Sequence, residues 1–186
     1  MIRDARRRTA ARSAGATIAT LSFTALLAAG GALAAGSGGV GTDDPAADVT
    51  SGNAAFPVRG KHTYGDGFGA GRGHQGQDLL AKCGKRVVAA QPGRIQIADS
   101  DGGAGNYVVI DGAGKRKDTV YMHLLRRAKV RKGNRVSAGE VIGRVGSTGN
   151  STTCHLHFEI WSGAGYYEGG HPVDPKPRLR RWDRAD

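Results

Sequence analysis

The spacing of glycine is the feature that most limits what this 186-residue chain can fold into. The chain contains 31 glycines, and beyond residue 55 they separate short apolar runs from one another. No segment shows a sustained helical period of 3.6 residues. Short apolar runs bounded by turn-forming residues are typical of strands. We therefore expect one all-β domain of ordinary size.

Individual strands can be assigned from these runs. We expect them at residues 86–90, 93–98, 106–111, 118–124 and 140–145, with shorter extended pieces at 129–130 and 135–136. Residues 59–77 contain seven glycines. Glycine at this density disfavours a helix, so we expect a loop or two short irregular strands there.

One expected strand, residues 153–161, carries two histidines on one face. Its sequence TCHLHFEIW alternates apolar and polar residues at period two, which predicts one buried face. The residues expected to face the core are Leu156, Phe158 and Ile160. The residues expected to share the opposite surface are His155, His157 and Glu159. Two adjacent imidazoles can serve one metal ion or one reacting centre, although two solvated surface histidines are the plain alternative.

The first 34 residues have the features of an export signal. Five arginines precede an apolar, alanine-rich segment, and Ala32-Leu33-Ala34 fits a signal-peptidase site. The alternative is a retained membrane anchor, because the segment is just long enough to span a bilayer, although weakly hydrophobic. Residues 35–54 have the composition of a flexible linker. We expect the functional domain at 55–177 and a basic surface tail at 178–186.

The charge of the chain is strongly positive. Removal of residues 1–34 would take away five of the 27 basic residues and one of the 16 acidic ones, so the net charge would fall from +11 to +7. Outside a cell, this charge favours attraction to an anionic envelope polymer or surface. No basic helix or aromatic–basic RNA motif is visible, so we expect no nucleic-acid partner. The alternative is that the positive charge only increases the solubility of the chain.

The chain has two cysteines, Cys83 and Cys154. A single pair in an exported chain favours a disulfide. The closed loop would be long, and the bond would stabilise the fold by roughly 4 kcal/mol if its geometry is unstrained. The alternative is that Cys154 is a metal ligand or a nucleophile.

A second polar cluster precedes the apolar pair at residues 79 and 80. His74 and Asp78 lie four residues apart and would share a face at the start of a strand, and a carboxylate at the border of a core requires a partner. Together with His157, they offer two imidazoles and one carboxylate. Three such ligands leave the fourth position of Zn²⁺ open for water, as in catalytic zinc sites. His123 and His155 would then remain for acid–base chemistry.

The motifs HxxxD at 74–78, YxHL at 121–124 and HLHFE at 155–159 resemble, in this order, those of the lysostaphin-like (LytM-type) zinc metallopeptidases. The resemblance runs from about Phe56 to Asp174. It implies a compact antiparallel β-sheet domain with a substrate groove over the sheet. It also implies one zinc ion on His74, Asp78 and His157, and a catalytic pair formed by His123 and His155. The implied reaction is hydrolysis of peptide bonds in bacterial peptidoglycan, in stem-peptide cross-links or glycine bridges.

The expected mechanism is metal-assisted hydrolysis in a secreted or envelope-located monomer. Zinc would acidify its bound water and polarise the scissile carbonyl. His155 would take the proton of that water, and His123 would bind the oxyanion or position the water. The two histidines could also act in each other's role. One alternative is a non-catalytic envelope module that binds wall peptides or activates a partner amidase. A weaker one is an enzyme that attacks glycine-rich segments of proteins.

His62 and His171 fit no ligand spacing, and we expect both in surface loops. His62 could also line the groove. Tyr64 and Phe68 either line the groove or pack the glycine-rich loop.

Overall fold

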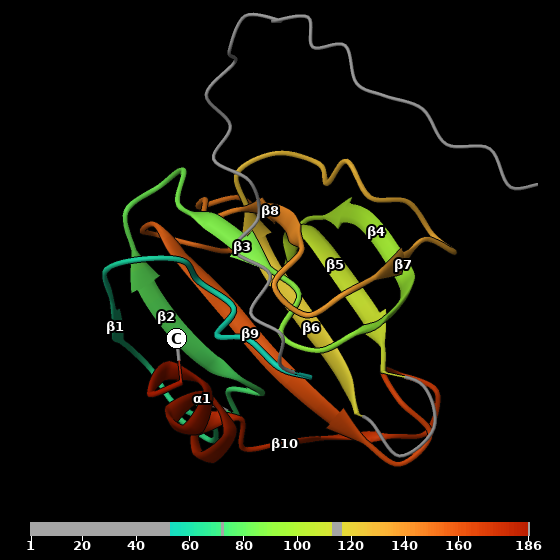
Figure 1. Cartoon of the computed structure of the whole chain (residues 1–186). Helices are drawn as coiled ribbons and strands as arrows, with labels where there is room; N and C mark the ends of the chain where they lie inside the picture. The colour runs from blue at the N-terminus through green and yellow to red at the C-terminus, as the bar shows by residue number, and fades with distance from the viewer. Residues whose placement is uncertain (1–52, 72, 113–116, 186) are drawn as a thin grey trace, which may run out of the picture. The chain divides into compact units, whose positions relative to one another are not determined.

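The structure is a computed structural model that describes residues 53–71, 73–112 and 117–185. It is mostly antiparallel β-sheet with one short helix (Figure 1), which confirms the expected fold class. The segment expected to direct export, 1–34, lies outside the described residues, as does almost all of the expected linker. None of the helices in the described ranges has both the length and the apolar character that crossing a bilayer requires.

The sheets place the strands at 155–162 and 77–81 side by side. The strands are β1 (His62–Tyr64), β2 (Gln77–Ala81), β3 (Arg86–Val88), β4 (Gly93–Asp101), β5 (Gly105–Asp111), β6 (Asp118–Leu124), β7 (Arg135–Val136), β8 (Val141–Arg144), β9 (His155–Ser162) and β10 (His171–Val173). The larger sheet has the order β1–β2–β9–β6–β5–β4–β7, with β10 also paired to β9. Strands β3 and β8 form a separate two-stranded sheet.

The strand predictions hold best in the middle of the chain. β6 has the predicted bounds, whereas β3 ends two residues before the expected 86–90 segment does. In the part of the chain that the structure describes, residues 129–130 belong to no strand. Apolar side chains from both sheets form the main core, among them Leu79 and Phe158 from the larger sheet and Val87 and Ile142 from the smaller one.

Strand β9 is buried on both faces, not on one as its alternation predicted. The expected core residues Leu156, Phe158 and Ile160 are fully buried. The opposite face is covered as well, because Trp161 joins a second apolar cluster with Val120 from β6 and Val109 from β5. His155, His157 and Glu159 therefore lie in a largely desolvated layer, with exposed fractions of 8%, 8% and 2%.

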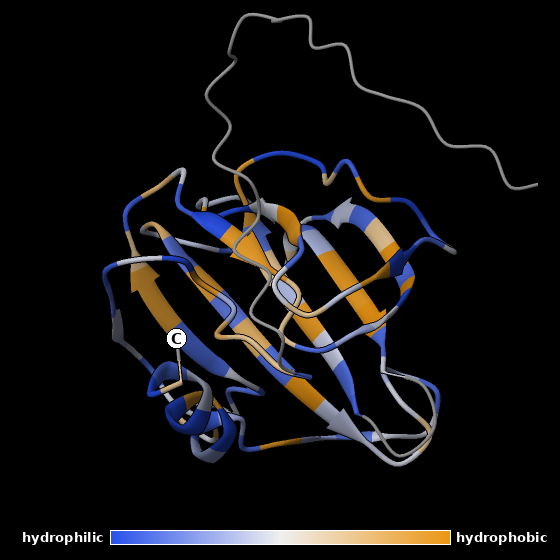
Figure 2. Cartoon of the chain, viewed as in Figure 1, coloured by the Kyte–Doolittle hydropathy of each residue, from blue (hydrophilic) through white to orange (hydrophobic). Residues whose placement is uncertain are grey.

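Helix α1 (Lys176–Asp183) occupies most of the segment expected to be a polar surface tail. The helix is largely hydrophilic (Figure 2), but Leu179 is fully buried in the main core and Trp182 packs against that core. These two side chains are three residues apart, so they share one helix face. The Tyr64 hydroxyl also donates a hydrogen bond to Asp183. The domain therefore includes this segment.

A disulfide joins Cys83 to Cys154 across 71 residues, as predicted. Cys83 follows β2 and Cys154 immediately precedes β9. The bond therefore ties together the ends of two strands that are already hydrogen-bonded neighbours.

Replacement of Leu179 by Ala should lower the free energy of unfolding by about 2–5 kcal/mol, because it leaves a cavity in the core. Urea denaturation followed by circular dichroism measures this change. Arg181→Ala, an exposed neighbour on the same helix, is the control and should change stability by only about 0.5 kcal/mol. Equal effects of the two substitutions would show that α1 does not contribute to the core.

Candidate functional site

The predicted ligand set meets where β2 pairs with β9. Asp78 and His157 are direct cross-strand partners, and His157 Nδ1 lies 2.9 Å from Asp78 Oδ1. His74 Nε2 lies 3.1 Å from the same oxygen. One ligand atom from each of the three residues lies within 4.8 Å of the other two. The structure therefore brings together the three residues that the sequence predicted.

The loop before β2 orients His74. Gln77 is fully buried, and its Nε2 donates hydrogen bonds to the carbonyls of Gly65 and Asp66 at 3.0 and 2.9 Å. His74 Nδ1 donates to the Gly67 carbonyl at 2.9 Å. Because a carbonyl only accepts, Nδ1 must carry the proton, which leaves Nε2 of a neutral ring unprotonated, with a lone pair on the side of Asp78 that can bind a metal ion.

Gly76 allows this loop to approach β9. A Cβ atom at this position would collide with the Phe158 carbonyl and lie 2.8 Å from His157 Nε2. Any other residue would displace either the strand or the histidine ring. The glycine within the HQGQD motif is therefore required by close approach to the site.

Behind His157, a carboxylate holds its second nitrogen. His157 Nε2 lies 3.0 Å from Glu159 Oε1, and Trp161 Nε1 donates to Glu159 Oε2 at 2.6 Å. All three side chains are buried. A histidine that binds metal through one nitrogen commonly donates from the other to a carboxylate, which fixes its tautomer and its orientation. This arrangement leaves Nδ1 of His157 as the metal-facing atom.

The protonation of the metal-free site follows from the same contacts. Burial lowers the pKa of His157, but the hydrogen bonds and charges of Asp78 and Glu159 outweigh it and raise that pKa to about 9. Burial raises the pKa of Asp78, but the hydrogen bond from His157 and the nearby imidazoles lower it overall. The metal-free site therefore holds an ion pair between an imidazolium and a carboxylate.

The donor set fits a zinc ion. Two imidazole nitrogens and one carboxylate oxygen are ligands that Zn²⁺ takes in catalytic sites, where a fourth position stays open. Calcium and magnesium prefer oxygen ligands. His74, Asp78 and His157 would hold the metal, and Glu159 would support it from behind.

The two remaining histidines of the motifs lie next to each other beside this cluster. The rings of His123 and His155 have centroids 4.7 Å apart. His155 Nδ1 donates to the Thr153 carbonyl at 2.9 Å, and its Nε2 lies 3.7 Å from Asp78 Oδ1. His123 Nδ1 donates to the Thr148 carbonyl at 2.8 Å. In their neutral forms, both rings therefore present an unprotonated Nε2 that can accept a proton. Burial lowers the pKa of His123 and the neighbouring imidazoles add to this effect, whereas the hydrogen bond to Thr148 opposes it without reversing it.

His123 reaches the site through a bulge in β6. Tyr121 belongs to the main core and Met122 to the opposite face, so regular alternation would return His123 to the core. The pairs Val108↔Tyr121 and Asn106↔Leu124 shift register by one residue. Two residues of β6 thus oppose one of β5, and His123 adopts a φ of 63°. Such bulges redirect side chains.

These side chains line a cleft with a volume of about 400 Å³. Its lining comprises His74, Asp78, Gly103, Met122, His123, Asn150, Ser151, Thr152, His155 and His157. All five predicted metal and catalytic residues are among them. The cleft therefore joins a metal-binding set to two proton acceptors in one partly enclosed space.

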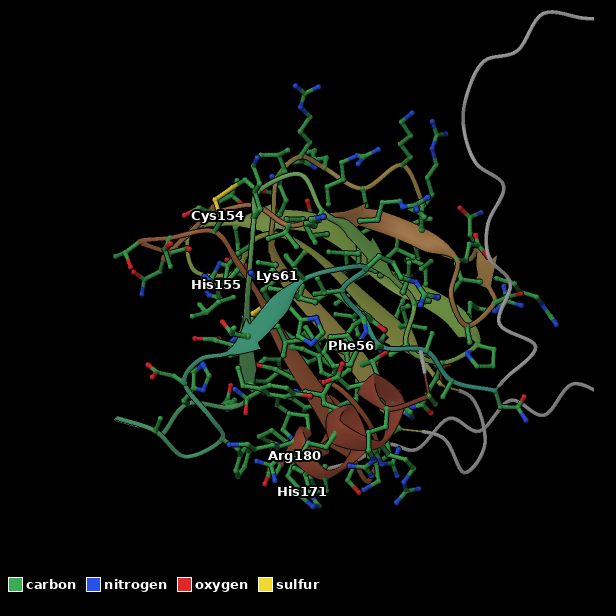
Figure 3. The ribbon with its side chains drawn as sticks, turned by 60° about the vertical axis from the view of Figure 1, so that its left-hand side comes forward. Phe56, Lys61, Cys154, His155, His171 and Arg180 are labelled. Carbon is green, nitrogen blue, oxygen red and sulfur yellow. A yellow bond between two sulfur atoms is a disulfide. The ribbon has the colours of Figure 1, made fainter. Side chains whose placement is uncertain are left out.

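The two other histidines and the aromatic residues Tyr64 and Phe68 do not line this cleft. His62 is in β1 and His171 in β10, so the expectation that both lie in loops is wrong. The His62 ring stacks on Phe56 with centroids 4.2 Å apart, and His171 lies far from His155 (Figure 3). Tyr64 packs against the main core, and Phe68 is not among the cleft residues.

Sequence reasoning gave no role to several residues that support the site. The alternation of β9 placed Glu159 on the face that carries His155 and His157. Trp161, two residues further along the strand, lies on the same face, so this alternation could have identified both residues. Thr148 carries no comparable signal, because its contact with His123 joins two segments that are distant in sequence.

Comparisons with known proteins agree with this geometry. The model of Peptidase family M23 matches residues 72–175. A "Peptidoglycan DD-endopeptidase ShyC" of Vibrio cholerae is 38% identical over 89 residues, which are 48% of this chain and 20% of the relative. The catalytic domain of the antimicrobial peptidase lysostaphin from Staphylococcus simulans has a TM-score of 0.58 and 32% identity, over 64% of this chain and 92% of that one. A zinc containing peptidase from Vibrio cholerae has a TM-score of 0.54 and 30% identity, over 64% and 37%. The chain spans only 20–25% of the length of the first curated relatives that it matches.

Replacement of Glu159 by Gln should weaken zinc binding by about 10- to 100-fold, because the amide cannot hold the imidazole as the carboxylate does. Competition titration against a chelating dye measures this affinity. The control is Glu140→Gln, which changes an exposed carboxylate that caps a turn at Ser137. Wild-type affinity in the Glu159 variant would contradict the supporting role.

Zinc binding to the metal-free chain should tighten as the pH rises from 7 to 9. His157, whose pKa is raised to about 9, must lose its proton to bind metal, so the apparent affinity should rise by about tenfold per pH unit below that value. Protonated His157 also contributes to the free energy of unfolding of the metal-free chain. This contribution is complete below pH 6.5 and is lost as the pH rises through about 9. Titration against a chelator of known pH dependence measures the affinity, and a flat profile would contradict the raised pKa.

Proposed function

The chain belongs to peptidase family M23, and on that basis we propose that it is a zinc-dependent endopeptidase that hydrolyses peptide bonds in bacterial peptidoglycan. The observation that carries the proposal is the meeting of His74, Asp78 and His157 around a common centre. Two further imidazoles face the same cleft. A metal site with adjacent proton acceptors is the arrangement that hydrolysis requires.

Zinc bound by these residues would supply Lewis-acid polarisation of the scissile carbonyl and a water of lowered pKa. The protein contributes orientation of that centre. His74 is held by the Gly67 carbonyl and His157 by Glu159, so neither ring needs to reorient when the substrate arrives. Pre-set geometry of this kind lowers the reorganisation that the reaction would otherwise require.

Proton transfer is assigned to the two remaining histidines. We assign the removal of the water proton to His155, because its Nε2 reaches to 3.7 Å from Asp78 Oδ1. Once protonated, that nitrogen can deliver the proton to the leaving amine. His123 Nε2 would hold the water by accepting a hydrogen bond, and would donate to the oxyanion only in its protonated form. The roles of His155 and His123 could also be exchanged, because each ring presents its Nε2 to the cleft.

The proposed substrate class is a peptide of the peptidoglycan cross-links, either a stem-peptide bond or a glycine bridge. The names of the relatives support this class, since one is a peptidoglycan DD-endopeptidase. The wall lies outside the cytoplasm, so we propose an extracytoplasmic location. The signal peptide or anchor at 1–34, the linker at 35–54, the remaining domain bounds and the monomeric state stay predictions.

Digestion of purified peptidoglycan by the full-length, zinc-loaded chain tests the proposal. Mass spectrometry of the released muropeptides identifies the bond that is cut. A chelator should abolish the release, and added zinc should restore it. His155→Ala should keep its zinc and lose about 10²- to 10⁴-fold in rate, whereas His157→Ala should lose zinc affinity as well.

His171→Ala is the matched control, because this exposed histidine lies outside the cleft, and it should digest at the wild-type rate. Wild-type digestion by both site variants would overturn the proposal. Binding of wall peptides without cleavage by the wild-type chain would favour the non-catalytic envelope module instead.

A further inference from the structure

The backbone of His123 has an uncommon conformation. Its φ is 63°, in the left-handed region that only a few per cent of residues other than glycine adopt, although histidine, like asparagine and aspartate, is enriched among them. His123 is also one of the two β6 residues that oppose a single residue of β5 in the bulge. Residues in such conformations persist only where surrounding contacts hold them. The contacts that hold His123 therefore decide whether its ring faces the cleft or the core.

Thr148 makes three hydrogen bonds at this point. Its carbonyl accepts from His123 Nδ1 at 2.8 Å. Its hydroxyl donates to the Leu124 carbonyl at 2.8 Å and accepts from the Asn106 backbone N–H at 2.9 Å. Asn106 and Leu124 are the pair that closes the bulge. One residue thus binds both the imidazole and the backbone that turns the imidazole toward the cleft.

Thr148 is itself held in place by close backbone packing. A Cβ atom on Gly105, whose φ is +65°, would collide with the Thr148 carbonyl and hydroxyl. Gly149, with a φ of +73°, packs equally closely against Gly103 and Gly105, and Asn150 donates its N–H to the Gly103 carbonyl at 2.9 Å. The segment at 148–150 therefore has little freedom to move, so it can act as a fixed support.

We infer that Thr148 is the positioning residue of His123. Its hydroxyl holds the bulge, and its carbonyl fixes the proton of His123 on Nδ1, so that Nε2 faces the cleft in a form that can accept a proton. This inference rests on the proposed function, in which His123 takes part in hydrolysis. Thr148 itself touches no reacting atom.

Thr148→Val tests the role, because valine keeps the shape and removes only the hydroxyl. In the full-length, zinc-loaded chain, kcat should fall by about 10- to 100-fold, the loss that a small misplacement of a reacting group produces. KM and zinc affinity should stay within about twofold, because no metal ligand is touched. Thr148→Ser, which restores the hydroxyl, should recover kcat to within about threefold of the wild type.

A second readout does not depend on activity. In ¹H–¹⁵N spectra, the Nδ1 proton of His123 should be protected from exchange in the wild type and in Thr148→Ser, and should exchange rapidly in Thr148→Val. The control is Thr119→Val, which removes a hydroxyl in β6 that is buried and accepts from the Tyr121 hydroxyl. It should destabilise the fold but leave kcat and the Nδ1 signal unchanged.

The outcomes separate this inference from the proposed function. Absence of hydrolysis by the wild type would overturn the function, while the Nδ1 signal would still test Thr148. Wild-type kcat together with a protected Nδ1 proton in Thr148→Val would overturn the inference. Should that variant not fold, Asn106→Ala removes the second hydrogen bond to the Leu124 carbonyl, 3.1 Å long. It should lower kcat at least threefold, and an unchanged kcat would count against the inference.

Discussion

The contact between Asp78 and His157 is the interaction on which the rest of the site depends. Asp78 Oδ1 lies 2.9 Å from His157 Nδ1, 3.1 Å from His74 Nε2 and 3.7 Å from His155 Nε2, so one oxygen stands among three imidazoles. The contact exists because β2 and β9 pair in a register that sets the two residues opposite each other. A slip of one residue would turn Asp78 to the opposite face. The disulfide just beyond the pair restrains such a slip.

Burial of both faces of β9 gives this contact its chemical character. In a desolvated layer, charges interact more strongly than in water, and an unpaired charge is costly. In this layer, Glu159 holds the far side of His157, and Trp161 donates a hydrogen bond to Glu159. The same contacts that raise the pKa of His157 orient the ring for a metal. His157 can therefore form an ion pair with Asp78 when the metal is absent and serve as a ligand when the metal is bound.

The five polar side chains reach the cleft by three different structural means. Asp78 in β2 and His155 and His157 in β9 arrive by the regular alternation of a strand, which is rigid and needs little local support. His74 arrives on a glycine-rich loop that is held by the side chain of Gln77. His123 arrives by a bulge in a disfavoured backbone conformation, which depends on hydrogen bonds from a distant segment. The role that we infer for Thr148 follows from this last difference.

Residue order alone predicted the β class, the bounds of β6 and the polar face of β9, because alternation at period two and the residue types of the motifs are local properties. It also favoured the disulfide, because the chain has only two cysteines. It also predicted which five residues would meet, through motifs and their resemblance to a family. Three features became visible only in the folded chain: the second face of β9 is buried, Leu179 packs the C-terminal segment into the core, and His123 turns away from the core. Those outcomes depend on packing and register between segments far apart in the chain, such as Thr148 and His123, and no local pattern encodes such contacts.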